Sequence, residues 1–117
     1  MIAEPRKTGL IGEMRAARYL RAKGYEIYSA NYRSKSGEID LIAEKDGILC
    51  FVEVKTRREN AYFTPAEAVD RQKEENVKNT AASFLSATKL KMPFRFDIIE
   101  VVLGETQYKI RHIENAF

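Results

Sequence analysis

The chain has 117 residues, of which 44% are apolar and 32% charged, and its formal net charge is +3. This length is typical of one domain with a modest core, and the apolar runs are too short for a membrane-spanning helix. The single cysteine, Cys50, excludes an internal disulfide, and the single histidine, His112, argues against a structural zinc site. We therefore expect one cytoplasmic domain over residues 1–117, with no secretory signal and no membrane association. The mild positive charge is compatible with a nucleic-acid partner.

The first predicted element is a helix over residues 8–23. Apolar side chains recur along it at helical spacing, and Gly24 supplies a C-terminal stop. The residues of this apolar side are Leu10, Met14, Ala17 and Leu20. Glu13 falls within the same arc at about 100° per residue, although carboxylates are rare on a side that faces the core. Glu13 therefore either pairs with an internal cation or metal, or lies at the rim of the core and reaches water.

Strands and a second helix follow in order. A strand is predicted over residues 25–32, and the segment GEIDLIAEKDGILCFVEVK, residues 37–55, predicts a β-hairpin with Asp46-Gly47 as its turn. Thr64 is a candidate N-cap for a helix that extends to about residue 89, either continuous or with a boundary near Asp70. Strands over residues 94–103 and 107–113 complete the order αβββαββ. This order predicts an α/β domain with a mixed central sheet flanked by helices.

The register of the hairpin places acidic side chains opposite each other. A two-residue turn at Asp46-Gly47 makes Asp40 face Glu53, and it makes Glu38 face Lys55. Because side chains alternate between the faces of a strand, these four lie on one face and an apolar set lies on the other. The apolar set consists of Ile39, Leu41, Ala43, Cys50, Val52 and Val54.

Opposed carboxylates on a partly buried face need compensating charge. Like charges directly opposite each other destabilise a sheet, and burial increases the cost of leaving them without a partner. Lys55 supplies one positive charge, whereas a divalent cation would supply two. Asp40, Glu53, the carbonyl of Val54 and water would form the oxygen-rich environment that Mg²⁺ prefers. The alternative is a solvated face on which Glu38 and Lys55 form an ordinary cross-strand ion pair.

The same acidic residues match a family signature. Glu13, Asp40 and Glu53-Val54-Lys55 resemble the E…D…(D/E)xK pattern of the PD-(D/E)XK nuclease superfamily, with Ile39 in place of the proline in its name. The segments GEMRAARYLRAKGYEIYSANYRSKSGEIDLIA, FVEVKTR, TPAEAVD and HIENAF together resemble the YraN family of small bacterial proteins over nearly the whole chain. This resemblance implies a restriction-endonuclease-like fold related to archaeal Holliday-junction resolvases.

The resemblance also implies an activity and roles for single residues. It implies a Mg²⁺- or Mn²⁺-dependent endonuclease that hydrolyses phosphodiester bonds in DNA, including branched or junction DNA. Asp40 and Glu53 would hold the metal, and Glu13 would support it directly or through water. Lys55 would orient or activate the attacking water. Gln72 is the nearest match to a glutamine that assists catalysis in related nucleases.

Basic residues beside the hairpin predict a surface for the phosphates of DNA. In the predicted register these residues gather at the end of the hairpin that carries Glu38 and Lys55, although a solvated basic loop is the alternative. They are Arg33, Lys35, Arg57 and Arg58, with Lys73 as an extension on the second helix.

Partners and alternative functions stay open at this point. A homodimer would suit symmetric cleavage of a four-way junction, and the strand over residues 94–103 or the C-terminal Phe117 could form its interface. Two other functions are compatible with the same residues: a nucleic-acid-binding module without catalysis, and a protein-interaction subunit that keeps the nuclease fold.

Overall fold

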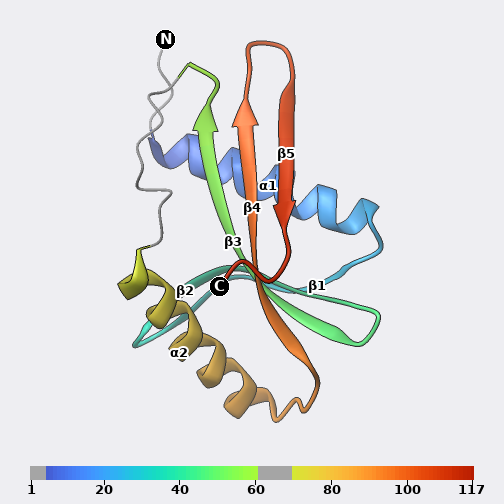
Figure 1. The fold of residues 1–117 in the computed structure, drawn as a ribbon, viewed down its shortest axis with the longest axis vertical. Coiled ribbons are helices and arrows are strands. Elements are labelled where there is room, and N and C mark those ends of the chain that lie inside the picture. Colours follow the sequence, from blue (N-terminus) through green and yellow to red (C-terminus); the bar gives the residue numbers. More distant parts are fainter. Residues whose placement is uncertain (1–4, 61–69) are drawn as a thin grey trace.

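The element order of the structure is the predicted αβββαββ. The computed structural model describes residues 5–60 and 70–117 (Figure 1). Its elements are α1 (Pro5–Ala22), β1 (Glu26–Ser34), β2 (Gly37–Lys45), β3 (Ile48–Arg58), α2 (Arg71–Thr88), β4 (Phe94–Leu103) and β5 (Tyr108–Ile113). The helix start predicted at Thr64 lies outside the described residues, so α2 is described from Arg71 onward.

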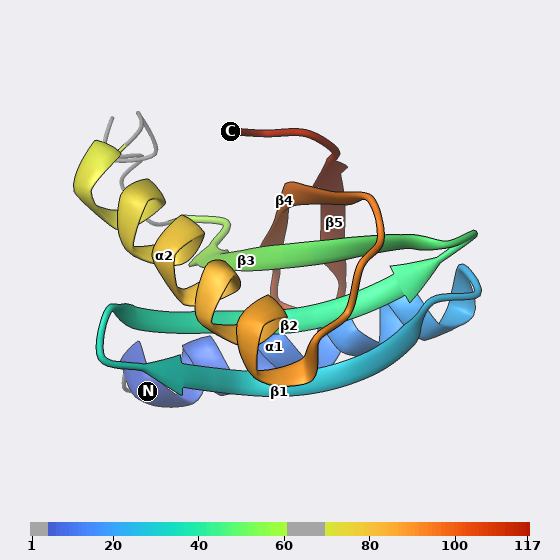
Figure 2. The ribbon, with the colours of Figure 1, turned by 90° about the horizontal axis from the view of Figure 1, so that it is seen from below.

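The sheet is mixed, as predicted. Its strands lie in the order β1-β2-β3-β4-β5, with β3 and β4 parallel and every other neighbouring pair antiparallel. The connection between the parallel strands contains α2, as a parallel pair requires a long crossover. Figure 2 shows β4 and β5 turned steeply against β1 and β2. β4 pairs with β3 over residues 94–103 and with β5 over residues 98–103, so little of its backbone edge is available for the dimer contact considered from the sequence.

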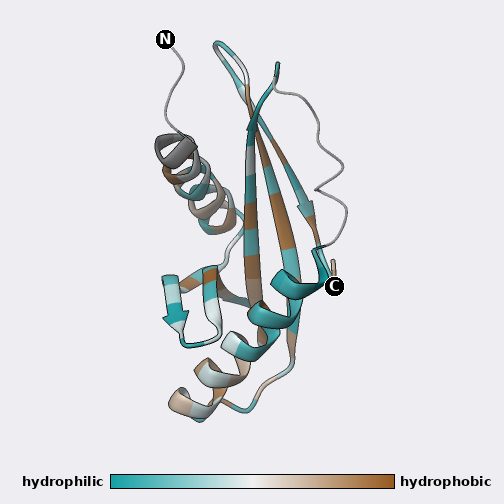
Figure 3. Ribbon diagram, turned by 90° about the vertical axis from the view of Figure 1, so that its left-hand side faces the viewer, coloured by the Kyte–Doolittle hydropathy of each residue, from teal (hydrophilic) through white to brown (hydrophobic). Residues whose placement is uncertain are grey.

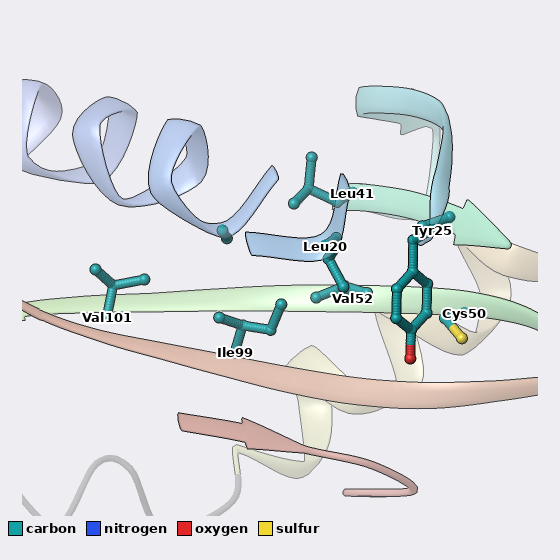
Figure 4. Packing of buried hydrophobic residues seen from close by; sticks show 9 residues of the cluster. Leu20, Tyr25, Leu41, Cys50, Val52, Ile99 and Val101 are labelled. Carbon is teal, nitrogen blue, oxygen red and sulfur yellow. The ribbon is translucent and has the colours of Figure 1, made fainter. Parts of the chain in front are cut away.

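The two helices cover opposite faces of the sheet (Figure 2). The core beneath α1 contains Ala16, Leu20, Tyr25, Leu41, Ala43, Cys50, Val52, Ile99 and Val101 (Figure 4). The core beneath α2 contains Ile39, Ile42, Leu49, Phe51, Val77, Ala81 and Phe84. The hydropathy colouring of Figure 3 shows brown apolar segments along the central strands and mostly polar colours on α2. Neither described helix is both long and apolar enough to cross a membrane.

The buried side of α1 differs from the predicted one. Leu10 is 52% exposed and Met14 is 70% exposed, whereas Ala16 and Leu20 are fully buried. The reason is the close approach of the helix to β3: a Cβ on Gly12 would lie 1.7 Å from Oγ1 of Thr56. Gly12 and Ala16 therefore face the sheet together with Leu20, and the larger apolar residues of the first half of α1 remain at the surface.

The capping residues of α2 explain where this helix begins and ends. The Asp70 side chain accepts hydrogen bonds from the backbone N–H groups of Gln72 (3.0 Å) and Lys73 (3.2 Å), so the boundary considered near Asp70 is the N-cap of α2. Lys89 closes the helix in the left-handed conformation, with φ of 57°. The side of α2 that faces the sheet buries Val77, Thr80, Ala81 and Phe84.

A buried polar network joins β4 to the C-terminal segment. Asp97, which is fully buried, accepts hydrogen bonds from Nε of Arg95 (3.0 Å) and from the backbone N–H of Asn115 (3.1 Å), and it lies 2.8 Å from Nε2 of His112. Burial works against the ionised carboxylate, but these partners outweigh it and lower the pKa of Asp97. His112 also packs edge-on against the ring of Tyr19, so it joins the polar network of Asp97 to the packing beneath α1.

The turn of the hairpin follows its predicted chemistry. Asp46 and Gly47 have φ values of 53° and 77°, as a type I′ turn requires. Pairing of β2 with β3 follows the predicted register from Lys45–Ile48 to Leu41–Val52. The pairs predicted next, beginning with Asp40–Glu53, are not among the residue pairs that β2 and β3 form.

Candidate metal centre

The two strands of the hairpin separate at Asp40. Oδ2 of Asp40 accepts a hydrogen bond of 2.8 Å from the backbone N–H of Val54, so a side chain replaces a backbone partner between the strands. Ile39 packs in the core beneath α2 rather than with Leu41 beneath α1. The predicted placement of Ile39 with the apolar set is therefore wrong, because simple alternation along β2 is interrupted at Asp40.

Three carboxylates converge where the strands separate. Glu13 of α1 and Glu38 and Asp40 of β2 each offer an oxygen within 4.8 Å of the others, and we call these residues the acidic cluster. Asn31 of β1 lies beside them in the left-handed conformation, with φ of 57°. With its amide nitrogen turned toward the carboxylates, Asn31 donates to Oε1 of Glu13 (3.3 Å) and to Oε1 of Glu38 (3.0 Å).

The pKa values of two carboxyl groups in the acidic cluster are raised, which disfavours their ionised forms. Burial raises the pKa of Asp40 to about 7, and the neighbouring Glu53 and Glu13 contribute to the rise, although the hydrogen bond from Val54 opposes it. Burial likewise raises the pKa of Glu13. A carboxylate that is both buried and surrounded by other carboxylates gives up its proton readily only when a cation compensates the charge.

Glu53 opens onto the same cavity as Asp40. Both line a space of about 360 Å³ together with Glu38 and Lys73. The Glu53 side chain is only 8% exposed, and its Oε1 lies 2.5 Å from Nζ of Lys73. Burial disfavours the charged form of Lys73, but the hydrogen bond and charge of Glu53 outweigh it, so the pKa of Lys73 is raised. Lys55 lines the adjoining pocket with Glu53 and Lys73.

The chemistry of the acidic cluster fits a hard divalent cation. Carboxylate oxygens are the ligands that Mg²⁺ and Mn²⁺ prefer, and a doubly charged ion would relieve the repulsion that raises the pKa of Asp40. Two of the predicted ligands, Glu13 and Asp40, belong to the acidic cluster. The predicted ligand Glu53 lies beside it, paired with Lys73.

Glu38 was absent from the predicted ligands. It lies two residues before Asp40 on the same strand, so alternation alone places both carboxylates on one face. The alternative interpretation of the sequence paired Glu38 with Lys55, but Oε2 of Glu38 lies 3.2 Å from Nε of Arg33. The pairing of β2 with β1, which opposes Arg33 and Glu38, explains this difference.

The predicted DNA-binding residues do not form one group. Arg33 and Lys35 lie at the turn between β1 and β2, whereas Arg57 and Arg58 lie at the far end of β3, at the top of Figure 1. The separation of β2 from β3 moves these two ends apart. The fifth residue, Lys73, is the partner of Glu53.

Gln72 lies in the first turn of α2, where it is exposed. Its Nε2 donates to Oδ1 of Asn76 at 3.2 Å. From α2, the residues that line the cavity of Asp40 and Glu53 are Lys73, Asn76 and Val77. Among the described residues, Gln72 is therefore connected to the cavity through Asn76.

Comparison with known proteins places these residues in a family context. The model of Uncharacterised protein family UPF0102 matches residues 12–101, which include the acidic cluster, Glu53 and Lys55. A UPF0102 protein of Alkaliphilus oremlandii (strain OhILAs) is 45% identical over 115 residues, covering 96% of this chain and 98% of the relative. A UPF0102 protein of Symbiobacterium thermophilum is 46% identical over 114 residues, covering 96% of this chain and 97% of the relative.

Proposed function

The chain belongs to the family UPF0102, the YraN family that its motifs resemble, and we propose that it is a divalent-metal-dependent nuclease that hydrolyses phosphodiester bonds in DNA. One observation carries the proposal: oxygens of Glu13, Glu38 and Asp40 lie within 4.8 Å of one another beside the buried Glu53. The mixed α/β sheet of the structure is compatible with a nuclease-like fold.

The acidic cluster would hold Mg²⁺ or Mn²⁺. Such an ion, when bound, polarises a phosphoryl oxygen and lowers the pKa of water. The chain itself orients the ligands: the N–H of Val54 fixes Asp40, and the amide of Asn31 fixes Glu13 and Glu38. The carbonyl of Val54 stays a predicted additional ligand.

Lys55 and Lys73 would act on the reacting phosphate from the side of Glu53. Both line the pocket that adjoins the cavity of Asp40. An ammonium group in a confined site stabilises negative charge that develops on phosphoryl oxygens, and Lys55 would also orient the attacking water. Hydrolysis adds water across the bond between phosphorus and the 3′ oxygen, so the products are a 5′-phosphate and a 3′-hydroxyl. The proton of the water ends on the leaving 3′ oxygen, which balances the reaction.

Metal binding and cleavage test the proposal separately. Calorimetry with Mn²⁺ and cleavage of single-stranded, duplex and branched DNA in Mg²⁺ would compare wild type with Asp40→Asn, Lys55→Ala and the control Arg111→Gln. Arg111 is exposed on β5, away from the acidic cluster. We expect Asp40→Asn to lose both binding and cleavage, and Lys55→Ala to keep binding and lose cleavage. Unchanged cleavage by both pure variants would refute these roles.

A nucleic-acid-binding module without catalysis is the second candidate. Two ion pairs favour this candidate, because basic side chains already compensate two of the carboxylates. Arg33 pairs with Glu38 of the acidic cluster, and Lys73 pairs with the neighbouring Glu53. Such a module would bind DNA equally well in EDTA and in Mg²⁺, and it would cut none of the substrates above.

A further inference from the structure

A groove between α1 and the sheet borders the acidic cluster. It has a volume of about 630 Å³ and an apolar lining from Leu10, Met14 and Ala17 of α1 and from Ala30 and Leu41 of the strands. We call it the α1 groove. Its volume lies within the range of pockets that bind small organic groups.

The apolar wall of the α1 groove is not used by the core. The sequence pattern assigned Leu10 and Met14 to the buried side of the helix, but 52% and 70% of their surfaces are exposed. Ile11 beside them is 39% exposed. Large apolar side chains that gather next to a polar centre are typical of a binding surface.

The charges around the α1 groove indicate an anionic occupant. Arg18 and Arg21, which are both exposed, line the groove. Glu13 and Asn31 also line it; Glu13 is part of the acidic cluster, and Asn31 donates hydrogen bonds to that cluster. A ligand in the groove would therefore meet apolar side chains and two guanidinium groups, and it would border the proposed metal centre at Glu13.

A second copy of the chain is less compatible with these charges than a nucleotide. In a two-fold symmetric dimer the same surface is buried on both copies, so the interface would gather Arg18 and Arg21 twice. A nucleotide offers phosphate to the arginines and a flat base to Leu10, Met14 and Ala30. Within a duplex both faces of a base are stacked, so the occupant must be an unpaired or extruded base.

We infer that the α1 groove receives one unpaired base of the DNA strand whose phosphate lies at the acidic cluster, an inference that rests on the proposed nuclease function. Arg18 and Arg21 then contact phosphates that flank this base. The inferred substrate is therefore DNA with an unpaired nucleotide next to the cut, such as an overhang, a flap or a branch point.

The experiment compares two DNA hairpins that differ only in an unpaired overhang. The overhang carries 2-aminopurine, whose fluorescence reports on unstacking, and affinity is measured by anisotropy in EDTA at fixed salt, because phosphate contacts depend on salt. Ala30→Phe fills the exposed floor of the groove, and Met14→Ser removes an exposed wall without removing a core residue. Arg18→Gln removes a groove charge, and Arg111→Gln is the charge-matched control on the opposite edge strand, β5.

We expect the three groove variants to bind the overhang hairpin at least ~5-fold more weakly, and the blunt hairpin within ~2-fold of wild type. The 2-aminopurine signal on binding should be lost in Ala30→Phe, and Arg111→Gln should behave as wild type. Thermal melts check that each variant is folded. Met14→Ser, at a largely exposed position, keeps the test valid if Ala30→Phe does not fold.

Other outcomes separate this inference from the nuclease proposal. Wild-type affinity for the overhang in all groove variants would overturn the inference, even if the protein binds Mn²⁺ and cuts DNA. Selective loss of overhang binding in a protein that binds no Mn²⁺ and cuts nothing would support the groove and refute the nuclease. A wild-type dimer that Met14→Ser converts to a monomer would identify a second copy as the occupant and overturn the inference.

Discussion

Replacing Asp40 with asparagine should stabilise the metal-free protein while removing its response to metal. The pKa of Asp40 rises from 3.8 to about 7, mainly because of burial. A pKa change of one corresponds to ~1.4 kcal/mol, so ionised Asp40 costs the metal-free fold up to about 4 kcal/mol at high pH. The amide oxygen of the new side chain would still accept the hydrogen bond from Val54, and partial hydration of the site reduces the penalty, so we expect a gain of roughly 1–3 kcal/mol at pH 8.

The sign of the pH dependence follows from the raised pKa. The folded protein holds the proton of Asp40 more tightly than the unfolded chain, so the free energy of unfolding in EDTA should fall as the pH rises from about 4 to about 7. Asparagine does not titrate, so the advantage of Asp40→Asn should be near zero at about pH 4 and complete at about pH 8.

Urea denaturation in EDTA across this pH range measures the effect. Repeating it with Mn²⁺ should stabilise wild type by ~2.7 kcal/mol at a metal concentration of about one hundred times Kd, and it should leave the variant nearly unchanged. The reasoning would be refuted by a variant that is less stable than wild type in EDTA at pH 8, or by a difference that does not depend on pH.

Three further substitutions test other contacts. Asp97→Asn should lower the free energy of unfolding in urea at pH 7 by about 3–5 kcal/mol, because it leaves buried donors such as His112 with a weaker partner. The pKa of Asp97 is lowered in the folded protein, so the stability that the ionised carboxylate contributes should be present above about pH 4 and lost as the pH falls through the folded pKa. Gly12→Ala should cost about 1–3 kcal/mol through contact with Thr56, and a double-mutant cycle with Thr56→Gly should recover part of it, whereas additive effects would contradict the contact. Lys73→Met should destabilise the metal-free protein by about 1–3 kcal/mol and make its melting temperature more sensitive to Mn²⁺ than that of wild type; equal sensitivity would show that Lys73 does not compete with metal for the carboxylate it contacts.

Local patterns were sufficient to predict the elements and much of the hairpin. The element order, the strand over residues 94–103 and the register from Lys45–Ile48 to Leu41–Val52 all agree with the structure. Each depends on periodicity or on turn residues such as Asp46-Gly47, which act over a few neighbouring positions. The family motif likewise pointed to Glu13 and Asp40, because it consists of residues at recognisable spacings.

The composition of the acidic cluster required contacts between distant segments. Glu38 turns toward Glu13 and Asp40 because β2 separates from β3 and Asn31 of β1 bridges the carboxylates. Lys73 neutralises Glu53 because α2 packs across the sheet beside it. No periodicity within one segment encodes these pairings, since each depends on how separate elements meet.

The exposed side of α1 illustrates the same distinction. A helical wheel considers only the polarity of the side chains, and it therefore predicted that Leu10 and Met14 face the core. In the folded chain the absence of a side chain at Gly12 lets the helix approach Thr56 closely, which rotates the larger apolar residues outward. Polarity along the chain set which segments fold into helices and strands, but the steric fit between them set which side chains reach the groove and the acidic cluster.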